Sequence, residues 1–121
     1  RVVTNDSNRP EIERLCVEHS KRSRAEPGCI AHNVHADCEM PDHLVFVELW
    51  SDSDAVRAHF AVPASGTFVK NISALSSEPT TIQIYRAEEI PASALAGLAE
   101  TGRANISNTA AMASGAQAKA R

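Results

Sequence analysis

A proline and glycine pair, Pro27 and Gly28, divides the first half of the chain into two segments of different periodicity. Before the pair, residues recur at the helical spacing i, i+3, i+4 and i+7, namely Ile12, Leu15, Cys16 and His19. This spacing predicts an amphipathic helix that begins near Arg9, with Pro10 in the first turn, where proline is tolerated. Proline disfavours helical geometry at the preceding residue and glycine permits a turn, so the helix is expected to end before Pro27.

After the pair, the pattern changes to the alternation of β-strands. Cys29 to Ala36 predicts a strand whose one face carries Ile30, His32 and Val34. A turn over Asp37 to His43 leads to a second predicted strand, Leu44 to Trp50. One of its faces carries Leu44, Phe46, Glu48 and Trp50, and the other carries Val45, Val47 and Leu49. Because both faces are largely apolar, this strand is expected to be covered on both sides.

The remaining elements complete an alternating order. Val56, His59 and Phe60 share one side of a predicted helix that breaks at Pro63, and a second helical stretch is expected from about Ala64. Thr80 to Ala87 alternates like a last strand, and Arg1 to Thr4 is typical of the end of a first strand whose beginning lies upstream or was trimmed. The resulting order, β-α-β-β-α-β, is the split βαβ arrangement of ferredoxin-like α+β domains.

Two regions are expected along the chain. Residues 1–90 form the predicted ferredoxin-like domain, with its first strand truncated. From Pro91 the sequence is rich in Ala, Ser, Gly and Asn and poor in large apolar residues. Such a composition buries little surface, so residues 91–121 are predicted to be a tail, partly disordered or with a short helix.

Composition argues against several classes of function. A chain of 121 residues favours one domain, and a net charge of −3 without blocks of Lys or Arg argues against a nucleic-acid partner. No apolar run approaches the roughly 18 residues that span a bilayer, so no membrane association and a cytoplasmic location are predicted. The three cysteines, an odd number without a C-x-x-C spacing, are expected to be reduced and partly buried.

Three short runs of residues, in a fixed order, resemble a known protein family. They are the run Ser23 to Cys29 (SRAEPGC), the run Phe46 to Trp50 (FVELW) and the run Arg57 to Phe60 (RAHF). Together they resemble the antibiotic biosynthesis monooxygenase (ABM) family, over roughly residues 1 to 87.

The resemblance implies a homodimer whose two sheets join back to back into an α+β barrel, with a pocket between sheet and helices in each protomer. It also implies oxidation of a small aromatic molecule, a quinol or polycyclic phenol, by O₂ without metal, flavin or haem, so no cofactor is expected. Deprotonation makes such a ring electron-rich enough to pass an electron to O₂. A base in a dry pocket could therefore suffice.

Trp50, His59 and His32 are the candidate catalytic residues. Trp50 is either a core aromatic or, as the resemblance implies, a pocket residue whose indole holds an aromatic substrate and donates a hydrogen bond to it. His59 either packs as a core or rim residue or acts as a general base, because neutral imidazole accepts a proton near pH 7. His32 lies on a strand face where the family often carries an aromatic residue.

Candidates for substrate binding are Arg24, Glu48, Phe46 and Phe60. Glu48 either forms a structural salt bridge with Arg24 or Arg57 or serves as an acid. Arg24 alternatively anchors an anionic group through bidentate hydrogen bonds.

The most metal-like motif is His32-x-x-His35-x-x-Cys38. Residues three apart on a strand point to opposite faces, so one ion could not easily gather both imidazoles, and no metal site is expected. The sequence also lacks the glycine-rich and nucleophile-elbow motifs of nucleotide, flavin and serine-hydrolase sites.

Two alternatives to a monooxygenase stay open because a fold does not fix a function. One is an isomerase or a haem-related enzyme on the same fold. The other is a non-catalytic dimer that binds a small molecule.

Overall fold

The computed structural model describes residues 1–95 and, for the backbone alone, residues 117–120. Its elements follow in the order β1 (Val2–Val3), α1 (Arg9–Ser23), β2 (Cys29–Ala36), β3 (His43–Trp50), α2 (Ser53–Ala61), α3 (Pro63–Leu75), β4 (Gln83–Arg86), a 3₁₀ turn (Ala92–Ala94) and β5 (Gln117–Ala120). This is the mixed α+β, ferredoxin-like class that the sequence predicts.

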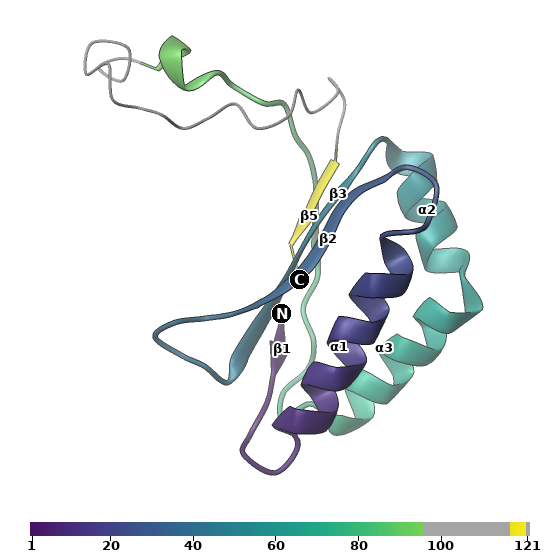
Figure 1. Ribbon diagram of the computed structural model, residues 1–121, viewed down its shortest axis with the longest axis vertical. Helices are drawn as coiled ribbons and strands as arrows, with labels where there is room; N and C mark the ends of the chain where they lie inside the picture. Colours follow the sequence, from purple (N-terminus) through teal and green to yellow (C-terminus); the bar gives the residue numbers. More distant parts are fainter. Residues whose placement is uncertain (96–116, 121) are drawn as a thin grey trace.

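Strand β3 is the centre of an antiparallel sheet. It pairs with β2 along one edge and with β1 and β5 along the other, and β4 pairs with β5. Opposite β2, the register places His32 across from Glu48 and Val34 across from Phe46. The α-helices α1, α2 and α3 all lie on one face of the sheet (Figure 1).

The helix predicted before Pro27 and the strand predicted after Gly28 are confirmed, as the bounds of α1 and β2 show. The predicted last strand is too long: β4 contains residues 83–86, and Thr81 exchanges backbone hydrogen bonds with Arg1 instead. Strand β5 was not predicted, because its sequence, QAKA, has no large apolar residues to mark a strand. Of the expected tail, residues 96–116 and 121 lie outside the described residues.

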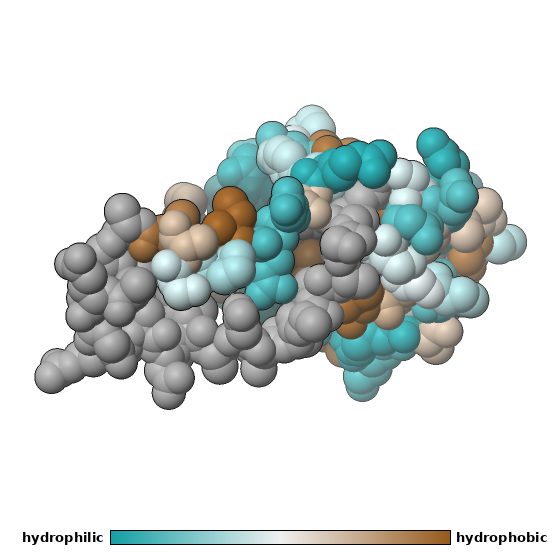
Figure 2. Space-filling model, turned by 90° about the horizontal axis from the view of Figure 1, so that it is seen from above, coloured by the Kyte–Doolittle hydropathy of each residue, from teal (hydrophilic) through white to brown (hydrophobic). Residues whose placement is uncertain are grey.

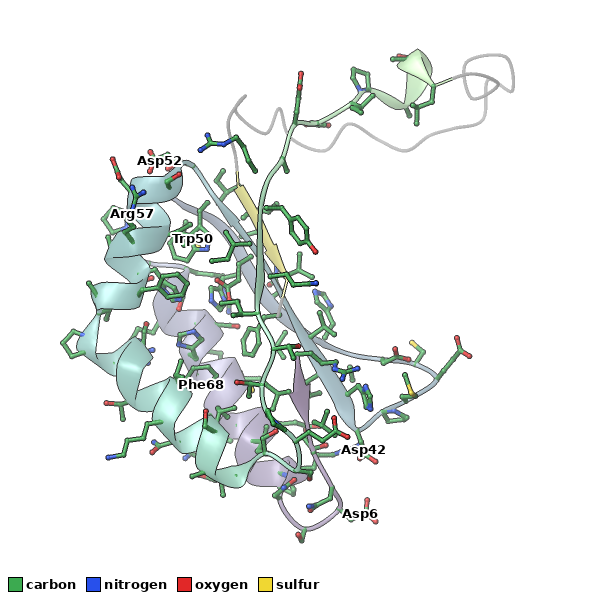
Figure 3. The ribbon with its side chains drawn as sticks, turned by 180° about the vertical axis from the view of Figure 1, so that it is seen from behind. Asp6, Asp42, Trp50, Asp52, Arg57 and Phe68 are labelled. Atoms are coloured by element: carbon green, nitrogen blue, oxygen red, sulfur yellow. The ribbon has the colours of Figure 1, made fainter. Side chains whose placement is uncertain are left out.

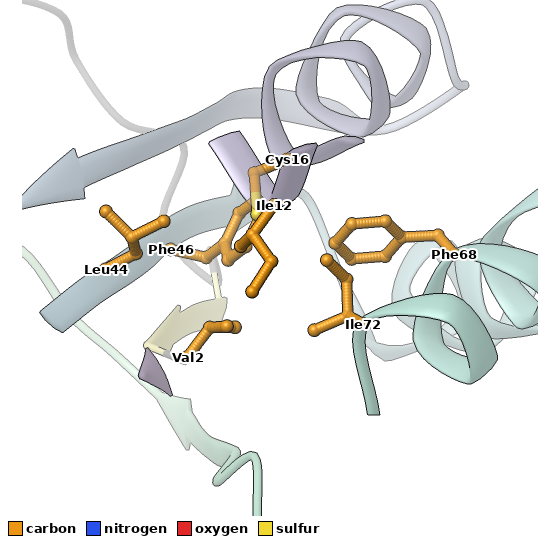
Figure 4. Close-up of a cluster of buried hydrophobic side chains, with 7 residues drawn as sticks. All are labelled: Val2, Ile12, Cys16, Leu44, Phe46, Phe68 and Ile72. Atoms are coloured by element: carbon orange, nitrogen blue, oxygen red, sulfur yellow. The ribbon is translucent and has the colours of Figure 1, made fainter. Parts of the chain in front are cut away.

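The main hydrophobic core lies between the sheet and helices α1 and α3 (Figure 4). Its buried members are Val2, Ile12, Cys16, Leu44, Phe46, Phe68 and Ile72. The helix-side face of β3 is buried at all four alternate positions, as predicted. The expectation of cover on both faces is not met within one chain, because Val47 on the opposite face is 41% exposed.

Gly28 sets a close contact between the start of β2 and helix α2. Its φ is +80°, a conformation that residues with a side chain rarely adopt. A Cβ atom added at Gly28 would lie 2.6 Å from the Cβ of Ala55. The Gly28 carbonyl also accepts a hydrogen bond from the backbone N–H of Ser51 at 2.8 Å. The turn therefore fixes where α2 begins relative to β2.

The three cysteines differ in burial and are therefore expected to differ in reactivity. Burial raises the pKa of the Cys16 thiol to about 12 and that of the Cys29 thiol to about 11, whereas Cys38 is exposed. The reactive thiolate of Cys16 is therefore about one part in 10⁴ at pH 8. We expect iodoacetamide at pH 8 to alkylate Cys38 first, Cys29 slowly and Cys16 only on unfolding. Peptide mass spectrometry over time measures this order, and equal labelling of Cys16 and Cys38 would contradict it.

Candidate functional site

A buried polar cluster lies between the sheet and the helices, where hydrophobic side chains would be expected. Helix α1 contributes His19, β2 contributes His32 and α2 contributes His59, and each is at most 1% exposed. We call these three residues the histidine cluster. The two strand positions beside it, Glu48 and Trp50 on β3, are fully buried as well. Figure 3 shows Trp50 between the sheet and α2.

The Glu48 side chain contacts both His32 on the neighbouring strand β2 and the indole of Trp50. Its Oε1 lies 3.3 Å from His32 Nε2, directly across the strand pair. Its Oε2 accepts a hydrogen bond from Trp50 Nε1 at 3.2 Å. The far ring nitrogen of His32, Nδ1, lies 2.9 Å from the hydroxyl oxygen of Ser20 on α1. A buried carboxylate is costly unless it is paired, and these contacts with His32 and Trp50 supply partners for it.

His59 is held by a second carboxylate, that of Glu26. The distance from His59 Nδ1 to Glu26 Oε2 is 2.6 Å, and Glu26 lies in the turn before Pro27 and Gly28. An ionised carboxylate only accepts hydrogen bonds, so the contact places a proton on Nδ1. In the neutral ring, Nε2 is then the basic nitrogen, as in the carboxylate and histidine pairs of hydrolytic enzymes.

His19 brings the third ring to the cluster. Its ring stacks on that of Phe68 at 3.9 Å with an interplanar angle of 4°, and its Nδ1 accepts a hydrogen bond from the Arg22 guanidinium at 2.7 Å. The ring centroid of His19 lies 5.0 Å from that of His32 and 5.3 Å from that of His59. One nitrogen from each of the three rings lies within 4.8 Å of the others.

A cavity of about 420 Å³ lies beside the cluster. Its lining is mostly apolar and includes Phe46, Phe60, Phe68, Ile72, Ile82 and Ile84. Phe46 contacts the His32 ring at a centroid distance of 5.6 Å, and Phe68 stacks on His19. Phe46 and Phe68, which we call the aromatic wall, therefore separate the cavity from the histidine cluster.

Comparison with known proteins now identifies the family. The family model described as antibiotic biosynthesis monooxygenase matches residues 4–71, which is more than half of the chain. The chain belongs to this ABM family. Family membership supports a general ABM-type function.

Solved structures and one curated protein are similar to this ABM chain. An antibiotic biosynthesis monooxygenase structure is 26% identical, with a TM-score of 0.66 over 74% of this chain and 93% of that one. A putative antibiotic biosynthesis monooxygenase from Deinococcus radiodurans is 23% identical, with a TM-score of 0.70 over 74% of this chain and 89% of that one, and shows the shared fold. An uncharacterized protein from Synechocystis is 34% identical over 67 residues, which are 55% of this chain and 46% of that protein. The ABM chain thus matches about half the length of that relative.

The structure brings the predicted catalytic residues together. Trp50 and His59 have ring centroids 4.7 Å apart, and His32 and His59 have centroids 5.6 Å apart. The indole N–H of Trp50 is donated to Glu48, whereas the sequence suggested a hydrogen bond to a substrate oxygen. None of these rings lines the described cavity, since the aromatic wall lies between.

The predicted binding residues divide into two groups. Phe46 and Phe60 line the cavity. Arg24 does not reach it: its guanidinium donates a hydrogen bond to the His32 carbonyl at 2.7 Å, on the outside of the cluster. The expected salt bridge from Glu48 to Arg24 or Arg57 is wrong, because Glu48 contacts His32 and Arg57 pairs with Asp54 on the surface at 2.7 Å.

Sequence reasoning missed Glu26 and His19 as site residues. Glu26 belongs to the SRAEPGC run, but the run alone does not show that its carboxylate meets a helix 33 residues later. His19 was included in the apolar stripe of α1, and its burial is confirmed, but its ring contacts His32 and His59. In the His32, His35 and Cys38 motif, His32 is buried whereas His35 and Cys38 are exposed, so the expected opposite-face placement of the two histidines is confirmed.

No helix among the described residues has both the length and the apolar character that a bilayer-spanning helix needs. Figure 2 shows hydrophilic and hydrophobic residues interspersed over the face viewed from above.

Proposed function

We propose that this ABM-family chain oxidises a quinol or polycyclic phenol with O₂, with His59 as the general base and Glu26 as the residue that orients it. The observation that carries the proposal is the 2.6 Å contact between His59 Nδ1 and Glu26 Oε2. A carboxylate at Nδ1 fixes the tautomer and stabilises the imidazolium that forms when Nε2 takes a proton.

In the proposed reaction, His59 Nε2 removes the phenolic proton of the substrate. The resulting phenolate passes one electron to O₂, and the phenoxyl radical and superoxide then combine. The new C–O bond forms at a ring carbon that carries hydrogen. That hydrogen leaves as a proton and the O–O bond breaks, which leaves a quinone carbonyl on the substrate. The other oxygen atom takes up this proton and the phenolic proton and leaves as water, so the substrate supplies all the electrons and no further reductant is needed. The protein's task is to deprotonate and to exclude water.

The cavity provides room for the proposed substrate. Its volume of about 420 Å³ lies within the range of small-molecule sites, and its apolar lining suits an aromatic ring. Phe60, on the cavity side of α2, is 44% exposed and its ring centroid is 5.8 Å from that of His59. In the proposal, the substrate reaches Nε2 when the aromatic wall moves aside next to Phe60.

Oxygen uptake tests the proposal. Purified protein is incubated with a panel of quinols and polycyclic phenols while dissolved O₂ is recorded, and matched phenol ethers, which carry no acidic proton, serve as controls. We expect uptake with at least one phenol and none with its ether. Uptake with no member of the panel, or equal uptake with an ether, would count against a base-initiated oxidation.

A non-catalytic binding protein is the second candidate. Its support is that the imidazoles are at most 1% exposed and lie behind the aromatic wall, so the cavity offers a ligand apolar contacts without a base. Fluorescence of Trp50, whose indole lies 6.2 Å from the His32 ring, would then report saturable binding of the same phenols without O₂ uptake. A haem titration followed by absorbance tests the haem-related alternative.

We further propose that the chain forms a homodimer through the face of the sheet opposite the helices. Figure 1 shows the helices on one side of the sheet only, among the described residues. On the other face lie the apolar or aromatic residues Ala31, Val45, Val47, Leu49 and Tyr85, together with the polar residues Asn33 and His35. An apolar sheet face of a small domain gains stability when a second copy covers it.

Val47→Asp is expected to raise the dissociation constant of this dimer by about 10²-fold or more, because each copy would bury an unpaired carboxylate. Val17→Asp is the matched control, since Val17 on α1 is 42% exposed and Val47 is 41% exposed. Sedimentation velocity over a concentration series measures both variants. A wild-type monomer at micromolar concentration, or equal effects of the two substitutions, would contradict the proposed interface.

A further inference from the structure

We propose that the histidine cluster binds a divalent first-row transition-metal ion, of which Zn²⁺ is the representative. This inference goes beyond the proposed oxidation, which uses His59 as a base and needs no metal. It rests on the position of His19, His32 and His59 and on the side chains around them.

The geometry is close to that of a three-histidine site. One nitrogen from each ring lies within 4.8 Å of the others, and the rings come from α1, β2 and α2. Nitrogen ligands at about 2.0–2.1 Å from a tetrahedral ion lie about 3.4 Å apart, so binding needs shifts of under about 1 Å per ring. The histidine cluster shares only His32 with the His32, His35 and Cys38 motif. That motif cannot gather one ion because His32 and His35 point to opposite faces of the strand.

The contacts around the rings are those that metal-binding histidines make. Such a ligand usually holds its second nitrogen in a hydrogen bond to a carboxylate, hydroxyl or carbonyl, which fixes the ring and its tautomer. His59 Nδ1 contacts the Glu26 carboxylate at 2.6 Å, and His32 Nδ1 contacts the Ser20 hydroxyl at 2.9 Å.

Charge balance also favours a cation. The carboxylates of Glu26 and Glu48 both reach the cluster, and Glu48 Oε1 is 3.3 Å from His32 Nε2. Two carboxylates offset the charge of a divalent ion in a site that excludes water. Glu48 is therefore the candidate fourth ligand.

Arg22 opposes metal binding at His19. Its guanidinium donates to His19 Nδ1 at 2.7 Å, whereas a neutral imidazole that binds an ion through Nε2 keeps its proton on Nδ1. The guanidinium therefore has to leave Nδ1 when the ion binds. Arg22 lies in the last turn of α1 and is partly exposed, so its side chain can turn to solvent.

A metal titration of the full chain tests the proposal. Protein freed of metal by a chelator is titrated with Co²⁺, whose visible absorption reports tetrahedral coordination, and then with Zn²⁺ by calorimetry. We expect one ion per chain and a melting temperature that rises with Zn²⁺. His19→Phe, His32→Phe and His59→Phe keep a ring in place and are each expected to abolish the Co²⁺ absorption, while His35→Phe, at an exposed position, leaves it unchanged.

Two variants retain all three histidines, so the test does not depend on the folding of the ligand variants. Glu26→Gln is expected to weaken Zn²⁺ binding by about 10–100-fold. Arg22→Gln removes the competing cation and is expected to tighten binding at least several-fold. Absence of binding to wild-type protein, loss of binding in His35→Phe, or weaker binding in Arg22→Gln would overturn the proposal. The two tests have different readouts, metal binding and oxygen uptake, so each can fail alone. An ion on His59 Nε2 occupies the nitrogen that the proposed oxidation uses as its base, so Zn²⁺ is expected to inhibit oxygen uptake.

Discussion

His59→Ala is expected to lower the rate of oxygen uptake with a phenolic substrate by about 10²–10⁴-fold near pH 7, because the substrate then has no base to receive its proton. The loss should shrink at high pH, where the phenol ionises unaided. The measurement is the initial rate of O₂ consumption against pH, divided by the folded fraction from circular dichroism. If His59 only packs beside Trp50, the rate per folded molecule stays at the wild-type value at every pH.

Two further variants distinguish the role of His59 as the base from the role of the residues around it. Glu26→Gln keeps the size of the side chain that contacts His59 Nδ1 but removes its charge, and is expected to cost about 10²-fold or more in rate by altering the tautomer. His35→Ala changes an exposed histidine on the face of β2 that points away from the cluster. It is the control and should leave the rate of oxygen uptake per folded molecule unchanged. If Glu26→Gln leaves the rate unchanged while His59→Ala lowers it strongly, His59 is still the base but Glu26 does not orient it.

Gly28→Ala is expected to lower the free energy of unfolding by about 2–5 kcal/mol, the sum of backbone strain and overpacking. The strain arises because φ at this residue is +80°. The overpacking arises because the new Cβ would lie 2.6 Å from Ala55 Cβ and 2.7 Å from Ser51 Oγ. Urea unfolding followed by circular dichroism measures the change.

Gly66→Ala is the matched control for this prediction. Gly66 lies in α3, and an added Cβ there would meet nothing within 4 Å. The same substitution is therefore expected to stabilise the protein by up to about 1 kcal/mol, because alanine favours a helix over glycine. A similar loss of stability in both variants would show that the close approach of Gly28 to Ala55 is not the cause.

Local patterns predict much of the fold. The alternation of β3 places Glu48 and Trp50 on one buried face, and the structure confirms this. The break at Pro27 and Gly28 predicts the end of α1 and the start of β2. In these segments, a periodicity of 3.6 or 2 residues is enough to assign each side chain to a face.

The contacts that make the site could not be predicted in this way. Glu26 and His59 meet because the turn at Gly28 packs against α2, which is a property of tertiary packing. His19 follows the apolar stripe of α1, and nothing in that spacing indicates that its ring meets two other imidazoles. The sequence likewise predicts an arginine as the partner of Glu48, because the cross-strand register that places His32 opposite Glu48 is not visible in one strand.

Because the aromatic wall separates the cavity from the histidine cluster, a molecule that enters through this cavity reaches the imidazoles after Phe46 or Phe68 has moved aside. The observed rate of binding then rises with concentration at first and levels off at the rate of this opening, which in proteins falls between microseconds and seconds. This limiting rate is a property of the protein and does not depend on which molecule enters. Two phenols of different reactivity that enter through this cavity should therefore reach the same limiting rate in stopped-flow measurements.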